Sequence, residues 1–232
     1  MEQLADGILW YVVFLFSTTC HEAAHAYAAM RLGDLTAYHG GQVTLHPLPH
    51  IKREPIGTVL VPLLSYFLGG WMIGWASAPY DPQWALRFPK RSALMALAGP
   101  AANLGIVLAS VLMIHTGILA GIFIPPESIH FMQVIGAVQE GSSAQVATML
   151  SVLFSLNLLL CVFNLLPLPP LDGSGVLPLM MSESLAARYM QFLLRGGLGF
   201  IGLIIAWRVF DVIFRPIHLF VINLLYPGTT YG

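Results

Sequence analysis

Residues 21–25 have the types and the spacing of a metal-dependent hydrolytic site. They read His-Glu-Ala-Ala-His. On a helix, residues four apart lie on one face, so the imidazoles of His21 and His25 can bind one metal ion. Zinc is the expected ion, because two neutral imidazoles leave room on it for a third protein ligand and a water. We therefore predict one Zn²⁺ per chain at this stretch.

Glu22 follows the first histidine and is the candidate catalytic base. It is rotated by about 100° from His21 around the helix. It is therefore poorly placed to bind the metal but well placed to take a proton from a nearby water. A chance match is disfavoured by the context, because the preceding residues 7–20 form an apolar run without a charge. Ionisable groups at membrane depth are costly and by default functional.

The composition is that of a membrane protein. Hydrophobic residues make up 57% and charged residues 9% of the chain, with a mean hydropathy of +0.77, whereas a soluble domain has about 25% charged residues. The formal net charge of −1 indicates no nucleic-acid partner. We predict an all-α polytopic protein of the lipid bilayer, in which residues 1–232 form a single transmembrane domain.

Apolar stretches that could cross a bilayer recur along the chain. A helix of about 20 residues spans the hydrocarbon core, and the stretches 7–31, 92–119 and 146–166 are long enough for this. A shorter apolar stretch, 196–209, is followed by the amphipathic residues 213–226, which either cross or lie in the membrane interface. We expect about four to six transmembrane helices.

The distribution of charge orients these stretches. Basic residues gather on the cytoplasmic side of membrane proteins. The loop 120–145 contains two acidic residues but no Lys or Arg, so we place it on the outer face. Eight of the ten basic residues then fall on the cytoplasmic side: Arg31, Lys52, Arg53, Arg87, Lys90, Arg91, Arg188 and Arg195.

Residues 56–79 are apolar, but Pro62 and the pair Gly69-Gly70 interrupt them. A single crossing would place the basic residues of 80–91 on the outer face, against the charge pattern. Irregular backbone at membrane depth is tolerated where protein or a cavity surrounds it. We therefore predict a re-entrant segment here. We also predict a small β element near the cytoplasmic face at 40–45, where polar and apolar residues alternate weakly.

Asp172 is the candidate third ligand. It follows three prolines that cannot continue a regular helix, and a carboxylate is a common third ligand in catalytic zinc sites with two histidines. Taken alone, the residue is better explained as the turn former of an Asp-Gly pair. The charge pattern favours the ligand, because the stretches 7–31 and 146–166 both run toward the cytoplasmic face. They bring Asp172 to the depth of His25.

Other polar residues leave alternatives open. His39, His46 and His50 are potential ligands, but they lie in a polar segment without helical spacing, and we expect solvated loop residues. Cys20 points away from the face that carries the two motif histidines. Asn103, in an apolar stretch, either makes a structural interhelical hydrogen bond or acts directly at the site.

Four separated motifs lie along the sequence: HEAAH at 21–25, GWASAP at 74–79, AGPAAN at 98–103 and NLLPLPPLDG at 164–173. Together they resemble the motifs of the site-2 proteases, the zinc intramembrane metalloproteases. The hallmarks of that family are HExxH and a later N-x-x-P-x-x-x-x-D-G. The stretch GWASAP is similar to the Gly-Trp-Ala-x-Pro sequence of short members, with one extra residue. The resemblance covers about residues 10–178 and implies a short form without PDZ or CBS domains.

The resemblance implies a role for each site residue. His21, His25 and Asp172 would bind zinc, Glu22 would be the catalytic base, and Asn164 would help to polarise the scissile carbonyl. It also implies regulated intramembrane proteolysis, in which peptide bonds in or near the transmembrane segments of substrate proteins are hydrolysed. We expect the protein in the plasma membrane of a prokaryote, with its active site nearer the cytoplasmic side.

Two other kinds of protein compete with this interpretation. A membrane zinc protease that trims prenylated C-termini usually has a glutamate as its third ligand, and no suitable Glu follows the motif on a span. A metal-binding transporter or a catalytically inactive membrane scaffold could also keep a metal site. The presence of Glu22 argues against inactivity.

Overall fold

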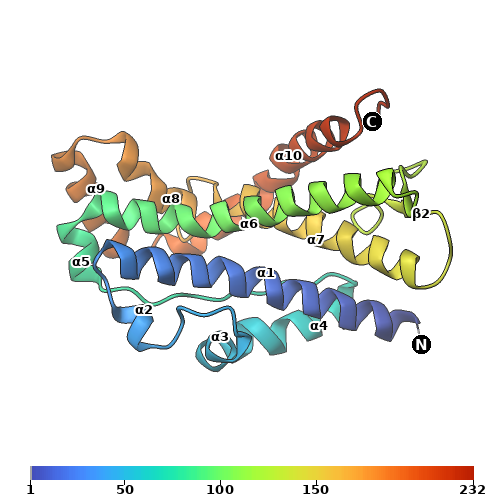
Figure 1. The fold of residues 1–232 in the computed structure, drawn as a ribbon. Helices are drawn as coiled ribbons and strands as arrows, with labels where there is room; N and C mark the ends of the chain where they lie inside the picture. The colour runs from blue at the N-terminus through green and yellow to red at the C-terminus, as the bar shows by residue number, and fades with distance from the viewer. Residues whose placement is uncertain (1) are drawn as a thin grey trace.

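Three long helices form the frame of the protein. The structure, a computed structural model, describes residues 2–232. Within this range, α1 (Glu2–Leu32), α6 (Pro89–Leu119) and α7 (Ser142–Asn164) are long and apolar enough to cross a membrane singly. α1 packs along α6, and α6 packs along α7 (Figure 1). The predicted all-α polytopic class is confirmed.

Shorter elements connect and extend this frame. α9 (Glu183–Leu194) and α10 (Gly199–Leu225) meet at 97° and would together make a fourth span. With this bent pair as one span the count is four, the lower end of the expected four to six, and without it the count is three, below that range. The stretches 196–209 and 213–226 are not separate, because α10 continues through Pro216. The remaining elements are α2 (Thr36–His39), α3 (Pro47–Arg53), the π-helix η1 (Ile56–Leu60), α4 (Val61–Gly69), α5 (Pro82–Arg87), β1 (Phe123–Ile124), β2 (Gly136–Ala137), α8 (Asp172–Val176) and the 3-10 helix η2 (Leu177–Met180).

Proline and glycine set the ends of the long helices. α6 begins at Pro89, a residue favoured at the first helical position because an N–H there has no partner within the helix. The chain leaves α6 through Gly121, whose φ of 70° lies in the left-handed region. α7 ends at Asn164, shortly before the proline-rich residues 167–170.

The protein places polar groups inside and large apolar groups outside. Ser17, Asn103 and Asn157 are fully buried among the long helices, whereas Leu112 and Leu119 of α6 expose 69% and 89% of their area. A soluble protein would gain free energy by the opposite arrangement. The exposed leucines are instead suited to contact with lipid, as the sequence predicted.

The segment 56–79 turns back on itself. η1 and α4 run in one direction, Gly70 reverses the chain with a φ of 73°, and an extended segment returns past its entry point toward α5 (Figure 1). The returning part is tied to the entering part, because the Trp75 N–H donates to the Gly57 carbonyl at 3.0 Å. This reversal of the chain is the path that the predicted re-entrant segment requires.

The small β element lies elsewhere than expected. β1 and β2 pair antiparallel within the connection from α6 to α7, the loop without Lys or Arg. Residues 40–45 form turns instead of the predicted strand, and the Gln42 N–H donates back to the Ala37 carbonyl at 2.9 Å. The prediction was wrong because the Gly40-Gly41 pair, with Gly41 at a φ of 72°, favours a turn over extended backbone.

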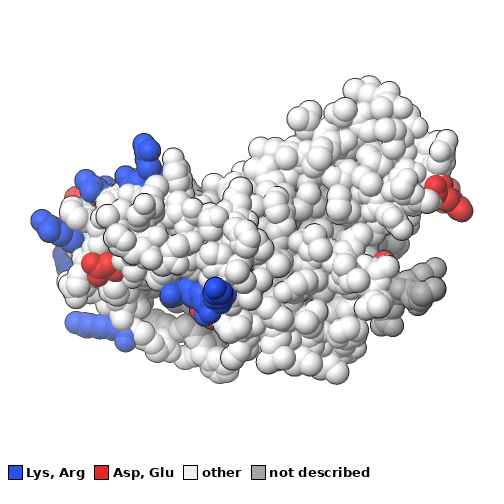
Figure 2. Space-filling model, turned by 60° about the horizontal axis from the view of Figure 1, so that its bottom comes forward, with Lys and Arg blue, Asp and Glu red and all other residues white. Residues whose placement is uncertain are grey.

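Charged side chains separate along the length of the molecule. Lys and Arg gather toward one end of the visible face, whereas the other end shows acidic groups only (Figure 2). The basic end is the one at which α1 ends and α6 begins, and the opposite end holds the loop 120–145 (Figure 1). Such a separation is typical of proteins that span a membrane.

The charge separation predicts which end of the bundle faces the cytoplasm. Single cysteines at Gln83 and Ser142, both exposed, would report on the two ends in a background of Cys20→Ala and Cys161→Ala. An impermeant thiol reagent should label Ser142→Cys in intact cells and Gln83→Cys only after permeabilisation. Labelling of Gln83→Cys from outside, with Ser142→Cys protected, would show the opposite orientation.

Candidate metal centre

Two histidines of α1 meet at one point. The stretch 21–25 is helical, as predicted, so His21 and His25 are one turn apart on the same face. Their Nε2 atoms are 3.0 Å from each other, and both side chains are buried. The rings meet edge to face, with centroids 4.6 Å apart.

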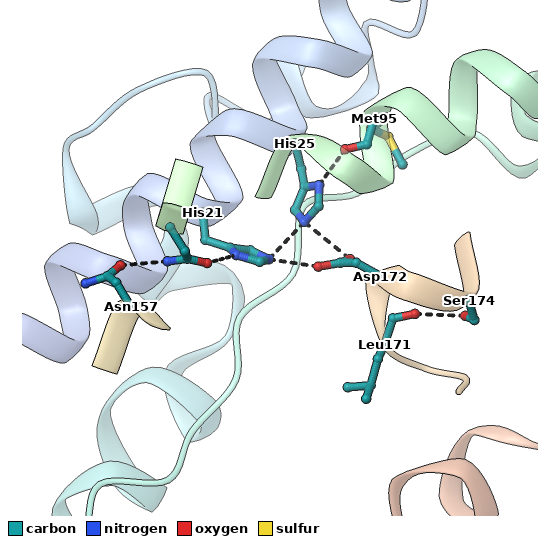
Figure 3. A network of polar contacts seen from close by, with 8 residues as sticks. His21, His25, Met95, Asn157, Leu171, Asp172 and Ser174 are labelled. Carbon is teal, nitrogen blue, oxygen red and sulfur yellow. Dashed lines mark hydrogen bonds and ion pairs between the residues drawn. The ribbon is translucent and has the colours of Figure 1, made fainter. Parts of the chain in front are cut away.

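Asp172 brings a carboxylate to this point from a distant part of the chain. Its Oδ2 lies 3.0 Å from His21 Nε2, and its Oδ1 lies 3.3 Å from His25 Nε2 (Figure 3). Gly173 allows the tight turn there, because a Cβ would overlap the Leu165 backbone. In the part of the chain that the structure describes, this is the only group of His, Cys, Asp or Glu whose ligand atoms all lie within 4.8 Å of one another.

The Nδ1 atoms of both imidazoles face hydrogen-bond acceptors. His21 Nδ1 is 2.5 Å from Asn103 Oδ1, and His25 Nδ1 is 2.7 Å from the Met95 carbonyl oxygen. Only a protonated nitrogen can donate to such an oxygen, so each Nδ1 carries the proton of its neutral ring. Each Nε2 then presents a lone pair toward the other ring and toward Asp172 (Figure 3).

This arrangement fits a zinc ion. Three electron-pair donors converge, two of them on buried imidazoles, which is unfavourable unless a cation lies among them. Nitrogen and oxygen ligands of one tetrahedral zinc lie about 3.3 Å apart, close to the three distances of 3.0, 3.0 and 3.3 Å between these atoms. Two histidines and a carboxylate are also the donor set of a catalytic rather than a structural zinc site.

Helix α6 leaves room for the ligand atoms at Gly99. A Cβ at this position would overlap the Nε2 atoms of both His21 and His25. One turn further along, Asn103 supplies the acceptor for His21. The AGPAAN stretch therefore contributes space and a hydrogen bond to the ligand group. Of the two alternatives for Asn103, the interhelical hydrogen bond is present, whereas a direct role in the reaction stays a prediction.

A cavity of about 500 Å³ adjoins the ligand group. Glu22 is buried and lies at its wall, outside the ligand group, as its place on the helix predicted. Burial raises the pKa of the Tyr80 hydroxyl, so this residue is a neutral hydroxyl at the wall. The lining of the cavity includes Glu22, His25, Asp172, Tyr80, residues 76–78 of the extended segment and the pair Pro169-Pro170, together with residues of α6, α8, α9 and the connection to α10.

Other residues singled out in the sequence lie away from the ligand group. Asn164 is the last residue of α7, is half-buried and does not line the cavity. His46 accepts a hydrogen bond from the backbone N–H two residues on, and His50 Nε2 faces the Thr44 carbonyl oxygen at 3.1 Å. Both histidines have local roles, but the expectation of a solvated loop residue was wrong for His50, which is buried within α3, because its ring turns inward to the Thr44 carbonyl.

Two residues near the site were missed by sequence analysis. The Met95 carbonyl oxygen accepts from His25, and Asn157 contacts the side chain of Asn103. Asn157 could have been noticed as an amide within the apolar stretch 146–166. A backbone acceptor has no sequence signal, because every residue carries a carbonyl.

A comparison with models of protein families shows to which family this protein belongs. The model of peptidase family M50 matches residues 9–204, which is most of the chain. The chain belongs to peptidase family M50. The resemblance to site-2 proteases is therefore confirmed, and this M50 protein is a membrane zinc metalloprotease of the site-2 type.

Curated relatives agree with this assignment. The candidate zinc metalloprotease YwhC of Bacillus subtilis is 30% identical over 78% of this chain and 72% of the relative. The candidate zinc metalloprotease Rip2 of Mycolicibacterium smegmatis is 31% identical over 73% of this chain, and Rip2 of Mycobacterium tuberculosis 34% over 71%. The M50 chain spans little more than half of these two Rip2 proteins, 56% and 54%. No solved structure gives a significant match.

The space at Gly99 predicts a steric test of the metal position. Gly99→Ala would push a methyl group against the Nε2 atoms of His21 and His25. It should lower the zinc affinity by at least roughly tenfold, measured by competition with a chelator. Gly105→Ala, on the same helix with nothing within 4 Å of the added Cβ, is the matched control and should bind zinc like the wild type. Equal affinities in the two variants would contradict this position.

Proposed function

We propose that this M50 metalloprotease is an intramembrane endopeptidase that cleaves membrane proteins in or near their transmembrane segments. The depth of the site carries the proposal. His21, Glu22 and His25 are buried within α1, a helix long and apolar enough to span a bilayer. A substrate that reaches them must itself enter the bilayer, and transmembrane segments are already there.

We infer that His21, His25 and Asp172 hold the zinc ion. The hydrogen bonds from each Nδ1 keep the two Nε2 lone pairs directed at the point where the carboxylate also arrives. When bound there, zinc polarises the scissile carbonyl and lowers the pKa of a nearby water to about 7.

Glu22 is the proposed general base. Its carboxylate takes a proton from the attacking water as the water oxygen forms a bond to the scissile carbonyl carbon. The proton then passes to the leaving nitrogen as the C–N bond breaks, which leaves Glu22 ionised and yields an amine and a carboxylic acid, and the acid then loses its own proton to the amine or to water. Its place at the cavity wall beside His25 and Asp172 supports this role.

The extended part of the re-entrant segment is the proposed substrate platform. Residues 76–78 line the cavity, and the Gln42 side chain fixes the segment by donating to the Ser77 carbonyl at 3.2 Å. A helical substrate must unwind before cleavage, because its carbonyls are bonded to amides four residues on. An unwound substrate strand could add alongside this extended backbone.

The active site is proposed to lie nearer the cytoplasmic face of a prokaryotic plasma membrane. Ser92 and Met95, close to the start of α6, line the cavity. This is the end at which the basic side chains gather (Figure 2). Water would therefore reach the cavity from the cytoplasmic side.

Replacement of the base predicts a loss of cleavage without a loss of metal. Glu22→Gln should slow proteolysis of a membrane-embedded test substrate by about 10²–10⁴-fold and retain zinc, because Glu22 is outside the ligand group. Cleavage would be followed in proteoliposomes and zinc by mass spectrometry. Glu127→Gln, on the exposed outer loop, is the control and should remain active.

Two outcomes would contradict the proposal. Activity of Glu22→Gln within tenfold of the wild type would exclude Glu22 as the general base. Zinc binding by the wild type without cleavage of any membrane-embedded substrate would favour a metal-binding transporter or an inactive scaffold.

The resemblance to site-2 proteases, rather than the position of Asn164 outside the cavity, supports the proposal that Asn164 stabilises the charge that develops on the carbonyl oxygen of the substrate. Asn164→Ala should lower kcat by roughly 10²–10³-fold with little change in KM, as for the loss of one oxyanion donor. Leu165→Ala changes an exposed neighbour and should leave kcat near the wild-type value. An unchanged kcat in Asn164→Ala would remove this residue from the mechanism.

A further inference from the structure

A buried chain of polar side chains connects His21 to α7. Asn103 Nδ2 donates to Asn157 Oδ1 at 2.8 Å, and Asn157 Nδ2 donates to Ser17 Oγ at 2.9 Å. Ser17, Asn103 and Asn157 are all fully buried. These hydrogen bonds link the three long helices, since Ser17 lies on α1, Asn103 on α6 and Asn157 on α7. Figure 3 shows the part of this chain of side chains from Asn157 to His21.

The direction of these hydrogen bonds is set by two backbone carbonyls. Asn157 Nδ2 also lies 2.8 Å from the Leu153 carbonyl oxygen, and the Ser17 hydroxyl donates to the Val13 carbonyl oxygen at 2.7 Å. A carbonyl oxygen can only accept, so the NH₂ group of Asn157 must face Leu153. Its Oδ1 is thereby turned toward Asn103.

The orientation of the Asn157 amide in turn determines that of the Asn103 amide beside His21. Because Asn157 Oδ1 accepts, Asn103 must turn its NH₂ group toward it and its Oδ1 toward His21. The oxygen of Asn103 can be satisfied only by a proton on His21 Nδ1. The Nε2 of His21 then carries a lone pair, which is the form that binds a metal.

We propose that Asn157 is a positioning residue that fixes the orientation of Asn103 and, through it, the tautomer and the direction of His21. The proposal rests on the ligand role proposed for His21 and goes beyond it, because Asn157 lies outside every motif of the chain and touches neither metal nor substrate. Hydrogen bonds to the far nitrogen of a ligand histidine orient the ring and tune its basicity. Here the orienting group is itself held by a third helix.

Packing alone does not explain this chain of side chains. Burying an amide pair at membrane depth costs free energy compared with two apolar side chains. Such polar groups are by default functional. Ser155 lies on the same helix, is equally buried, and its hydroxyl has no partner in the structure. It provides a matched control for the burial of a polar group on α7.

The test measures the tautomer of His21 directly. Protein with ¹⁵N-labelled histidine rings is stripped of metal in lipid nanodiscs, and two-bond ¹⁵N–¹H correlation spectra report which ring nitrogen carries the proton. The signals of His21 are assigned by their loss in His21→Gln. The variants are Asn157→Leu, Asn157→Asp, Ser155→Ala and the pair Asn103→Leu with Asn157→Leu, which leaves no amide unpaired between α6 and α7.

The variants should differ in the tautomer of His21 and in their affinity for zinc. The wild type, Ser155→Ala and Asn157→Asp, whose carboxylate still accepts from Asn103, should keep the Nδ1–H form of His21. Asn157→Leu and the double variant should populate the Nε2–H form and bind zinc roughly 10–100-fold more weakly. The double variant reports on Asn103 and Asn157 together if the single leucine variant does not fold.

Two results would overturn the proposal. One is an unchanged tautomer of His21 in folded Asn157→Leu, whatever the double variant shows, because the double variant also removes the acceptor on Asn103; the other is an equal shift in Ser155→Ala. A failure of the proposed function is distinguishable, because the spectra are recorded without metal. If the leucine variants shift the tautomer but His21→Gln binds zinc like the wild type, the positioning role of Asn157 is supported and the assignment of His21 as a zinc ligand is rejected.

Discussion

The lone pairs of His21 and His25 and the carboxylate of Asp172 repel one another, yet the fold holds them about 3 Å apart, with both imidazoles buried and the carboxylate at the cavity wall. The Nδ1 atom of each imidazole faces a hydrogen-bond acceptor, which fixes the ring. Asp172 reaches the site through a turn in which only glycine fits at position 173. A zinc ion removes this repulsion by binding all three groups. Metal binding to such a preformed group should therefore also stabilise the folded protein.

Helix α6 supports the site from one face. Met95, Gly99 and Asn103 are spaced four residues apart, so they lie on one side of the helix. They supply the acceptor for His25, the space for both Nε2 atoms and the acceptor for His21 in turn. The spacing matches that of the two histidines on α1. The order is reversed, as antiparallel helices require.

Much of this could be predicted from the sequence because it depends on local spacing and composition. The four-residue spacing of the histidines, the lack of charge in the long apolar stretches and the basic residues at one end are all visible in the sequence. Asp172 was found through topology, since a shared metal requires two spans to run in the same direction. The turn at 40–45 was mistaken for a strand, because a weak alternation was given more weight than the positive φ that a Gly-Gly pair allows. Asn157 was missed because its function depends on contacts with distant helices.

The central claim is that two imidazoles and a carboxylate, and no thiolate, surround one zinc ion. Zinc K-edge X-ray absorption of the purified protein measures this most directly. The account predicts one zinc per chain with nitrogen and oxygen scatterers at about 2.0–2.2 Å and two imidazole signatures. It also predicts that Asp172→Ala changes this ligand shell. A sulfur shell at about 2.3 Å, which Cys20 would supply, or an unchanged shell in Asp172→Ala would contradict it.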